Sequence, residues 1–168
     1  ESLDKSYNDM SKAYTKIFKR MGLNTVSVKA DSGAMGGEGS EEFMVLSEVG
    51  EETIIFCSKC DYRANVEKAE VRAEEIAKHY TDKNLEEVYT PNIKTINDLE
   101  KFFNTTADNF IKTILYKTEE NEIIAVIIRG DLEINETKLS NDLGGLEIEL
   151  ANEETVKEIT GAKVGFAS

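Results

Sequence analysis

Apolar residues recur at spacings of mostly three and four positions along the first twenty residues, which is the period of one face of an α-helix. They are Leu3, Tyr7, Met10, Tyr14, Ile17, Phe18 and Met21. Gly22 follows directly, and glycine is a common residue just after a helix end. The pattern therefore predicts an amphipathic helix over residues 3–21.

Short apolar runs come next and predict strands at Thr25–Val28, Phe43–Ser47 and Thr53–Phe56. A turn signal at Gly50–Glu52 separates the last two runs, so these two are expected to form a hairpin. Helix, strand and hairpin together predict part of an antiparallel sheet with a helix against one face. Apolar residues at helical spacing then predict a second helix over residues 66–80.

A polar stretch with little pattern, residues 81–89, follows this helix. A chain of 168 residues can hold one ordinary domain or two small ones. We therefore expect a first unit over residues 1–80, a linker over 81–89 and a second unit over 90–168.

The second unit begins at the only proline, Pro91, and alternates helical and strand patterns. The predicted elements are a helix that begins after Thr95, a short helix capped by Thr106 that ends near Ile111, an antiparallel hairpin of 113–116 with 123–128, a helix from Asn135 to Gly144, a strand at Leu146–Leu150 and a last helix from Asn152 to Gly161. The predicted fold class is α+β, an antiparallel sheet with helices followed by a mixed α/β unit.

The formal charge is −13, from 33 acidic and 20 basic residues. Binding to a phosphate backbone draws on a basic surface, so affinity for RNA would need a local basic spot or parts outside this chain. No apolar stretch is long enough for a membrane span, and the first residues lack the layout of a secretory signal. Because Glu1 stands where an initiator Met would, we expect a piece of a longer protein.

Two cysteines, Cys57 and Cys60, form a C-x-x-C motif. One such motif supplies at most two of the four ligands of a structural zinc, and the only histidine, His79, is not spaced as a partner. A thioredoxin-like pair would open a helix, whereas this motif follows a predicted strand. A reduced pair without metal is the favoured prediction, ahead of a zinc site and of redox chemistry.

Three motifs carry a family resemblance through their order and spacing. They are G-G-x-x-S-x-E-F at Gly36–Phe43, D-Y-x-A-N-x-E at Asp61–Glu67 and T-P-N-x-K-T at Thr90–Thr95. Together they resemble the bacterial-type prolyl-tRNA synthetases. Further matches in the second unit are Lys112–Lys117, Arg129–Asp131 with Glu133, Asn135 and Lys138, and Val164–Phe166.

The resemblance implies that the first unit is part of a class II catalytic core and that residues 90–168 are the first part of an inserted editing domain. Such an enzyme ligates proline to its tRNA using ATP and Mg²⁺, and the insertion hydrolyses alanine mistakenly esterified to that tRNA. A pocket rejects a smaller apolar group weakly, because a missing methylene is worth only about 1–3 kcal/mol. The implied partners are proline and tRNA(Pro), in a cytoplasmic homodimer with no DNA or membrane partner.

The family's editing residues fall on Lys112, Thr90 and Gly165 of this chain. Each also has a structural interpretation: a solvated lysine, an extended residue before proline and an ordinary loop glycine. On the prolyl-adenylate side of the core the resemblance implicates Gly36, Gly37, Ser40, Glu42 and Phe43.

The family's ATP-gripping motifs fall upstream and downstream of these residues, so the chain by itself is not expected to aminoacylate tRNA. Its later editing residues fall beyond Ser168. Two alternatives stay open. A free-standing aminoacyl-tRNA deacylase would resemble residues 90–168 but would have no use for the G-G-x-x-S-x-E-F motif, and a non-catalytic protein-binding module would suit the acidic charge.

Overall fold

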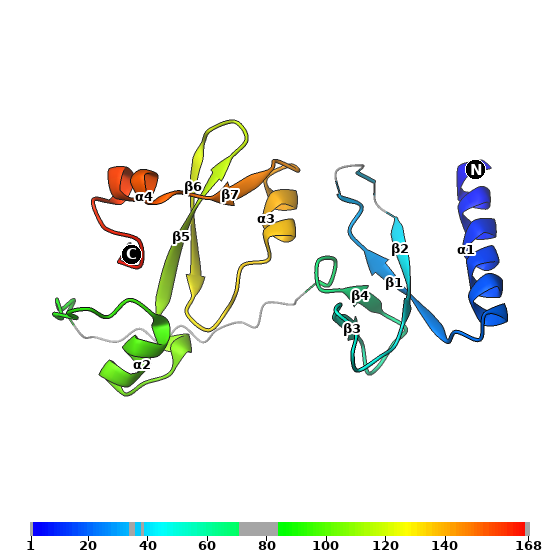
Figure 1. The fold of residues 1–168 in the computed structure, drawn as a ribbon, viewed down its shortest axis with the longest axis horizontal. Helices are drawn as coiled ribbons and strands as arrows, with labels where there is room; N and C mark the ends of the chain where they lie inside the picture. The colour runs from blue at the N-terminus through cyan, green and yellow to red at the C-terminus, as the bar shows by residue number, and fades with distance from the viewer. Residues whose placement is uncertain (1, 34–35, 38, 71–83, 167–168) are drawn as a thin grey trace. The chain divides into compact units, whose positions relative to one another are not determined.

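The computed structural model describes residues 2–33, 36–37, 39–70 and 84–166, and the chain divides into two compact units, Glu1–Glu74 and Glu75–Ser168 (Figure 1). The predicted boundary at residue 80 and most of the helix predicted over residues 66–80 lie outside the described residues. Each unit has its own sheet, so the fold mixes helices and strands in both halves.

The first unit combines one long helix with a four-stranded sheet. Its elements are α1 (Ser2–Arg20), β1 (Thr25–Ala30), β2 (Ser40–Val45), β3 (Ile54–Phe56) and β4 (Arg63–Asn65). The strand order is β2-β1-β4-β3, in which β1 runs antiparallel to β2 and parallel to β4. The sheet is therefore mixed: the expected antiparallel pairing is found for β1 with β2 and for β3 with β4, and it is wrong for β1 with β4.

The predicted hairpin between the second and third strands is also wrong. β2 pairs with β1, β3 pairs with β4, and the two lie at opposite edges of the sheet. The reason is β4, whose three residues, Arg63–Asn65, are too few to show an alternating pattern in the sequence. Once β4 occupies the place beside β1, the turn signal at Gly50–Glu52 marks a connection between edges instead of a hairpin.

The start of the predicted second helix is a turn. The Asn65 side chain accepts a hydrogen bond from the Lys68 amide at 2.9 Å, and its carbonyl accepts one from the Ala69 amide at 2.9 Å. Asn65 is only 3% exposed. Asparagine side chains compete with helix formation through local bonds of this kind, so residues 66–68 form a turn at the end of β4.

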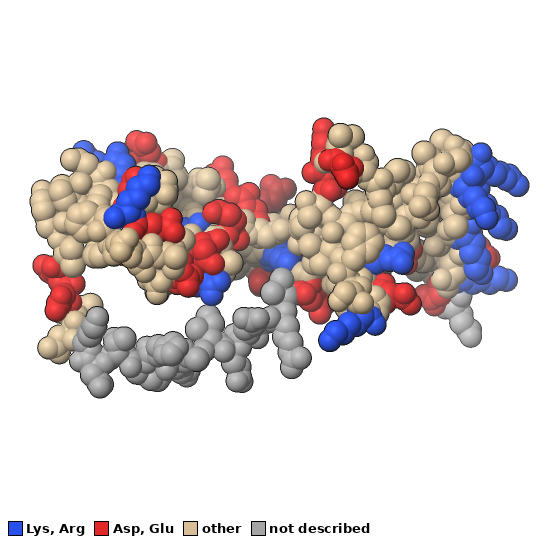
Figure 2. Space-filling view, turned by 90° about the horizontal axis from the view of Figure 1, so that it is seen from below, with Lys and Arg blue, Asp and Glu red and all other residues tan. Residues whose placement is uncertain are grey.

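The long helix α1 packs on the sheet through aromatic side chains, as the sequence predicts. The ring of Phe43 on β2 lies 5.7 Å from that of Tyr14 and 5.8 Å from that of Phe18. Successive residues of an α-helix are 100° apart around its axis. This spacing places the basic residues in one stripe on the side of the helix opposite Tyr14 and Phe18. These are Lys5, Lys12, Lys16, Lys19 and Arg20, and Figure 2 shows blue side chains gathered over α1.

The second unit follows the predicted order of elements. They are α2 (Ile96–Phe103), the 3₁₀ turn η2 (Ala107–Asn109), β5 (Ile111–Thr118), β6 (Ile123–Arg129), α3 (Glu136–Asp142), β7 (Ile148–Leu150) and α4 (Glu153–Thr160). The strand order is β6-β5-β7, antiparallel throughout. The short helix expected to end near Ile111 is a single 3₁₀ turn, because Ile111 already pairs with Arg129 in the sheet.

Side-chain caps begin α2, α3 and α4 where the sequence predicts them, whereas the cap predicted at Thr106 is not found, because its side chain accepts no capping hydrogen bond from η2. Thr95, Asn135 and Asn152 each accept a hydrogen bond from the amide three residues on, at 2.9–3.1 Å. These bonds satisfy amides that have no partner within the helix. At the other end of α4, Gly161 takes the left-handed conformation with φ 72°. None of the described helices combines the length and apolar character that crossing a bilayer requires.

Candidate functional site

Lys112 is the second residue of β5, and most of its side chain is shielded. Its Nζ lies 3.0 Å from Glu133 Oε1, with the Lys112 side chain 19% exposed and the Glu133 side chain 88% exposed. The structural alternative, a freely solvated lysine, therefore does not describe Lys112. A shielded cation that keeps one solvent-facing partner is suited to meet an anionic or polarised group.

Tyr116 lies on the same face of β5 as Lys112, because side chains four positions apart on a strand point the same way. Its hydroxyl donates to Glu136 Oε1 at 3.1 Å. Burial raises the pKa of Tyr116, and the carboxylates of Glu136 and Glu133 raise it further. The segment 133–136 thus supplies carboxylates to this face of β5, and Asn135 holds it by capping α3.

A second ion pair lies at the end of β6, which is next to the start of β5. The Arg129 guanidinium contacts the Asp131 carboxylate twice, with Nε–Oδ1 at 2.5 Å and Nη2–Oδ2 at 2.9 Å. Arg129 holds the pKa of Asp131 below its usual range, and Lys112 adds a smaller contribution in the same direction. Two cations and two carboxylates, those of Lys112, Arg129, Asp131 and Glu133, therefore form one charged cluster.

Thr90 and Gly165 come from the two ends of the second unit, and Lys94 connects their surroundings. Thr90 opens a turn in which its carbonyl accepts from the Ile93 amide at 3.4 Å. Gly165 has φ 87°, and a Cβ built there would lie 3.5 Å from Lys94 Cβ. Lys94 Nζ lies 5.5 Å from the centroid of the Phe166 ring. The T-P-N-x-K-T motif and the loop at Gly165 are thus neighbours.

The structure groups these sequence-predicted residues in two places. Lys112 belongs to the charged cluster, and Gly165 belongs to the contact with Lys94; no hydrogen bond or ion pair among the described residues joins the turn at Thr90 to Lys112. Tyr116, Glu136 and Lys94 are not among the site residues predicted from the sequence. Alternation along β5 is the signal that would have placed Tyr116 beside Lys112.

The residues predicted to line the core pocket do not share one face. Ser40 and Glu42 alternate with Phe43 on β2, and Phe43 packs on α1. Gly36 and Gly37 both have positive φ, and a Cβ at either would meet open space. The Ser32 hydroxyl donates to the Gly37 carbonyl at 2.9 Å. The described part of this glycine loop is thus an open, turn-rich backbone, and a role in binding prolyl-adenylate stays a prediction.

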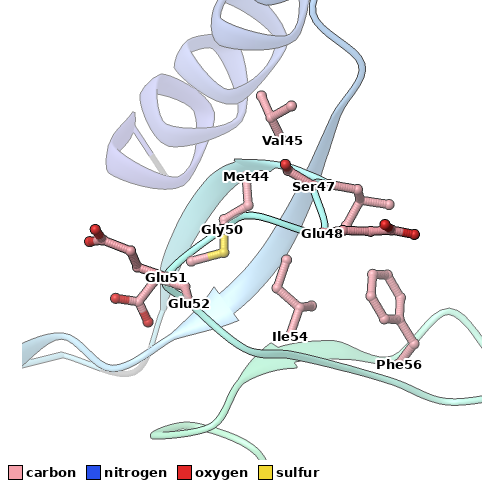
Figure 3. A pocket seen from close by; sticks show the side chains of 10 residues that line it. Met44, Val45, Ser47, Glu48, Gly50, Glu51, Glu52, Ile54 and Phe56 are labelled. Atoms are coloured by element: carbon pink, nitrogen blue, oxygen red, sulfur yellow. The ribbon is translucent and has the colours of Figure 1, made fainter.

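A hollow of about 590 Å³ lies elsewhere in the first unit (Figure 3). Met44, Ile54 and Phe56 supply apolar side chains to it, and carboxylates on the connection between β2 and β3 surround them. These acidic residues are Glu48, Glu51 and Glu52. None of the predicted pocket residues lines the hollow, and its negative charge disfavours a phosphate ligand.

That the chain alone binds neither ATP nor Mg²⁺ stays a prediction. In the first unit, Lys29 lies over the ring of Tyr62 and Arg63 lies over the ring of Phe56. In the part of the chain that the structure describes, no group of three or more His, Cys, Asp or Glu side chains could hold a metal ion. The absence of zinc at Cys57 and Cys60 stays a prediction.

Comparison with known proteins connects both units to one kind of enzyme. Residues 90–168 match the family model described as the aminoacyl-tRNA editing domain. The whole chain is 85% identical to a stretch of the proline–tRNA ligase of Brachyspira hyodysenteriae, and 99% of it is 53% identical to that of Caldicellulosiruptor saccharolyticus. It spans 29% of the length of each.

One solved structure, described as "a putative trans-editing enzyme for prolyl tRNA synthetase", matches 46% of this chain and 48% of its own, with 18% identity and a TM-score of 0.42. The sequence matches, in contrast, extend over the whole chain. They confirm the resemblance to the bacterial-type prolyl-tRNA synthetases: the chain is similar over its whole length to a stretch of proline–tRNA ligases, and residues 90–168 match the aminoacyl-tRNA editing domain.

Proposed function

We propose that residues 90–168 contribute the hydrolytic editing site of a proline–tRNA ligase, and that this site removes alanine from tRNA(Pro). The first unit then contributes to the class II core that ligates proline with ATP and Mg²⁺. The observation that carries the proposal is the whole-chain identity to proline–tRNA ligases together with the match of the second unit to an editing domain.

The hydrolysis needs no protein nucleophile. An aminoacyl ester is already activated, and the terminal ribose of the tRNA offers a hydroxyl that can orient water. The protein then has to hold the terminal adenosine, exclude larger side chains and stabilise the developing oxyanion. Thr90 can hydrogen-bond the ribose or the substrate amine, and Gly165 can leave space where a side chain would intrude.

The pair of Lys112 with Glu133 suits Lys112 to the electrostatic part of this task. Separating the pair leaves the exposed Glu133 carboxylate in water, where the loss of one surface partner costs little. Lys112 stays shielded, and a charge in a shielded position acts more strongly on a phosphate or an ester oxygen than a charge in bulk water. A substrate oxygen can therefore replace Glu133 as the partner of Lys112.

A free-standing deacylase is the runner-up. It would require only the second unit, whereas the match to a proline–tRNA ligase covers the whole chain and so includes residues 1–70. A non-catalytic binding module would give no account of the editing-domain match.

The test uses a chimaera, in which this chain replaces its 85% identical counterpart in the Brachyspira hyodysenteriae ligase. Deacylation of alanyl-tRNA(Pro) is measured for the chimaera and for its Lys112→Ala variant. Loss of one well-placed charge in a protected site is worth about 2–4 kcal/mol, so we expect a roughly hundredfold slower deacylation. Charging of tRNA(Pro) with proline should continue nearly unchanged.

The matched control is Lys117→Ala, which removes the same charge from the other face of the same strand. It should leave deacylation close to that of the parent chimaera. Equal deacylation rates for the parent and Lys112→Ala would refute the role of Lys112.

A further inference from the structure

The connection between β3 and β4 contains two exposed free thiols within one tight loop. β3 ends at Phe56, and the Cys57 amide donates to the Tyr62 carbonyl at 3.0 Å, which closes the loop. Cys57 and Cys60 are both exposed, and neither is in a disulfide. A small molecule in solution can therefore reach both sulfurs.

The backbone of this loop directs a hydrogen-bond donor at the sulfur of Cys57. The Lys59 amide donates to Cys57 Sγ at 3.4 Å. This bond first, and the neighbouring Cys60 after it, lower the pKa of Cys57, because donors stabilise the charged form of the group they face. The two cysteines therefore differ: the sulfur of Cys57 accepts the hydrogen bond from the Lys59 amide, and Cys60 supplies a second free thiol nearby.

Low thiol pKa, exposure and an adjacent second cysteine are the features of cysteines that react reversibly with oxidants. From the geometry of this loop we propose that Cys57 and Cys60 are a reversible dithiol–disulfide pair, with Cys57 as the attacking sulfur and Cys60 as the resolving one. The co-reactant is a low-molecular-weight disulfide of the glutathione type.

The exchange has two steps. The Cys57 thiolate attacks one sulfur of the small disulfide, so that a mixed disulfide forms and one small thiolate leaves. Cys60 then loses its proton and attacks the Cys57 sulfur, which forms the Cys57–Cys60 bond and releases the second small thiolate. The protein loses two electrons and two protons, and the small disulfide is reduced to two thiols.

The structure favours this chemistry over the two alternatives for a C-x-x-C motif. A thioredoxin-like site places its first cysteine at the start of a helix, whereas this loop joins two strands of a sheet. A structural zinc needs four ligands, and no third ligand lies near these sulfurs among the described residues. The hydrogen bond from the Lys59 amide to Cys57 activates a nucleophile without a metal or a helix.

The test exposes the 168-residue chain to glutathione disulfide at neutral pH and follows each cysteine by mass spectrometry. We expect the chain to lose both free thiols and two hydrogen atoms, to retain no glutathione, and to recover both thiols on reduction. Cys60→Ser keeps the backbone donor but removes the resolving thiol, so it should accumulate a stable mixed disulfide at Cys57.

Cys57→Ser is the matched variant, with Cys60 as its only thiol. It should react several-fold more slowly than Cys60→Ser, because the Lys59 amide donates to the sulfur of Cys57 and so activates that thiol. Since both residues are exposed, circular dichroism should show the same fold for all three proteins. Equal reaction rates of the two variants, or glutathione retained on both cysteines of the parent chain, would overturn the proposal.

Discussion

At the scale of single residues, the strand pattern alone could not distinguish a shielded Lys112 from a solvated one. The sequence places Lys112 beside a strand, but its shielding depends on Glu133, which is 21 positions away and reaches it only after the chain turns through β6. Prediction from the sequence pattern is limited in the same way for Tyr116. Its contact with Glu136 is a tertiary contact, and no local sequence pattern encodes it.

The raised pKa of Tyr116 gives a prediction at this scale. Tyrosine is neutral when protonated. A tyrosine whose pKa is higher in the folded state than its unfolded value of about 10 makes its full contribution to the free energy of unfolding at pH values below about 10. This contribution is lost as the pH rises through the raised pKa. In an NMR titration of labelled tyrosine rings, Tyr116 should ionise above the ordinary tyrosine pKa of about 10.

Glu136→Gln serves as the control, because it removes a negative charge that opposes ionisation while it keeps an acceptor for the hydroxyl. The midpoint of Tyr116 should move down in this variant. If Tyr116 titrates at the ordinary tyrosine pKa of about 10, the contact between Tyr116 and Glu136 does not exist in solution.

At the scale of elements, the predictions that succeeded rest on local chemistry. Caps such as Thr95 and Asn152 are recognisable because the capping residue and the amide that it binds are three positions apart. The predictions that failed rest on pairing between distant strands. The sequence alone could not show that β4 runs parallel to β1, because this choice depends on which strand reaches the free edge of β1 after the chain has passed through β2 and β3.

Thr95 offers a test of an element. Its Oγ1 accepts from the Asp98 amide at 3.1 Å and donates to the Asp98 carboxylate at 2.8 Å. Thr95→Ala should lower the free energy of unfolding of the second unit by about 1 kcal/mol, measured by urea denaturation. Thr95→Ser keeps the hydroxyl and should retain most of the stability. An alanine variant as stable as the serine variant would show that the cap contributes nothing.

At the scale of the whole molecule, the chain spans 29% of the length of the ligases it matches, and its two units have separate sheets. The order of the sequence motifs along the chain indicated the resemblance to the prolyl-tRNA synthetases. They could not show which face of β2 each residue of the glycine-loop motif occupies, since Phe43 is directed to α1 by its packing with Tyr14 and Phe18.

We predict that the 168-residue chain does not activate proline by itself. The chain spans only 29% of the length of the ligases it matches, so most of the residues of such an enzyme lie outside it. Proline-dependent exchange of pyrophosphate into ATP should stay at background for the chain and reach a clear rate for the chimaera. Exchange by the chain alone would mean that the first unit is not a partial catalytic core.

The editing assignment is tested most directly by comparing the hydrolysis of alanyl-tRNA(Pro) and prolyl-tRNA(Pro) by the chimaera. An editing site acts as a second sieve, which admits the smaller residue and excludes the larger one. We expect the alanyl ester to be hydrolysed at least about tenfold faster than the prolyl ester. The rates of the Lys112→Ala variant with the same two esters serve as the reference. Equal rates for the two esters, or alanyl-ester hydrolysis no faster than in the absence of protein, would contradict the assignment.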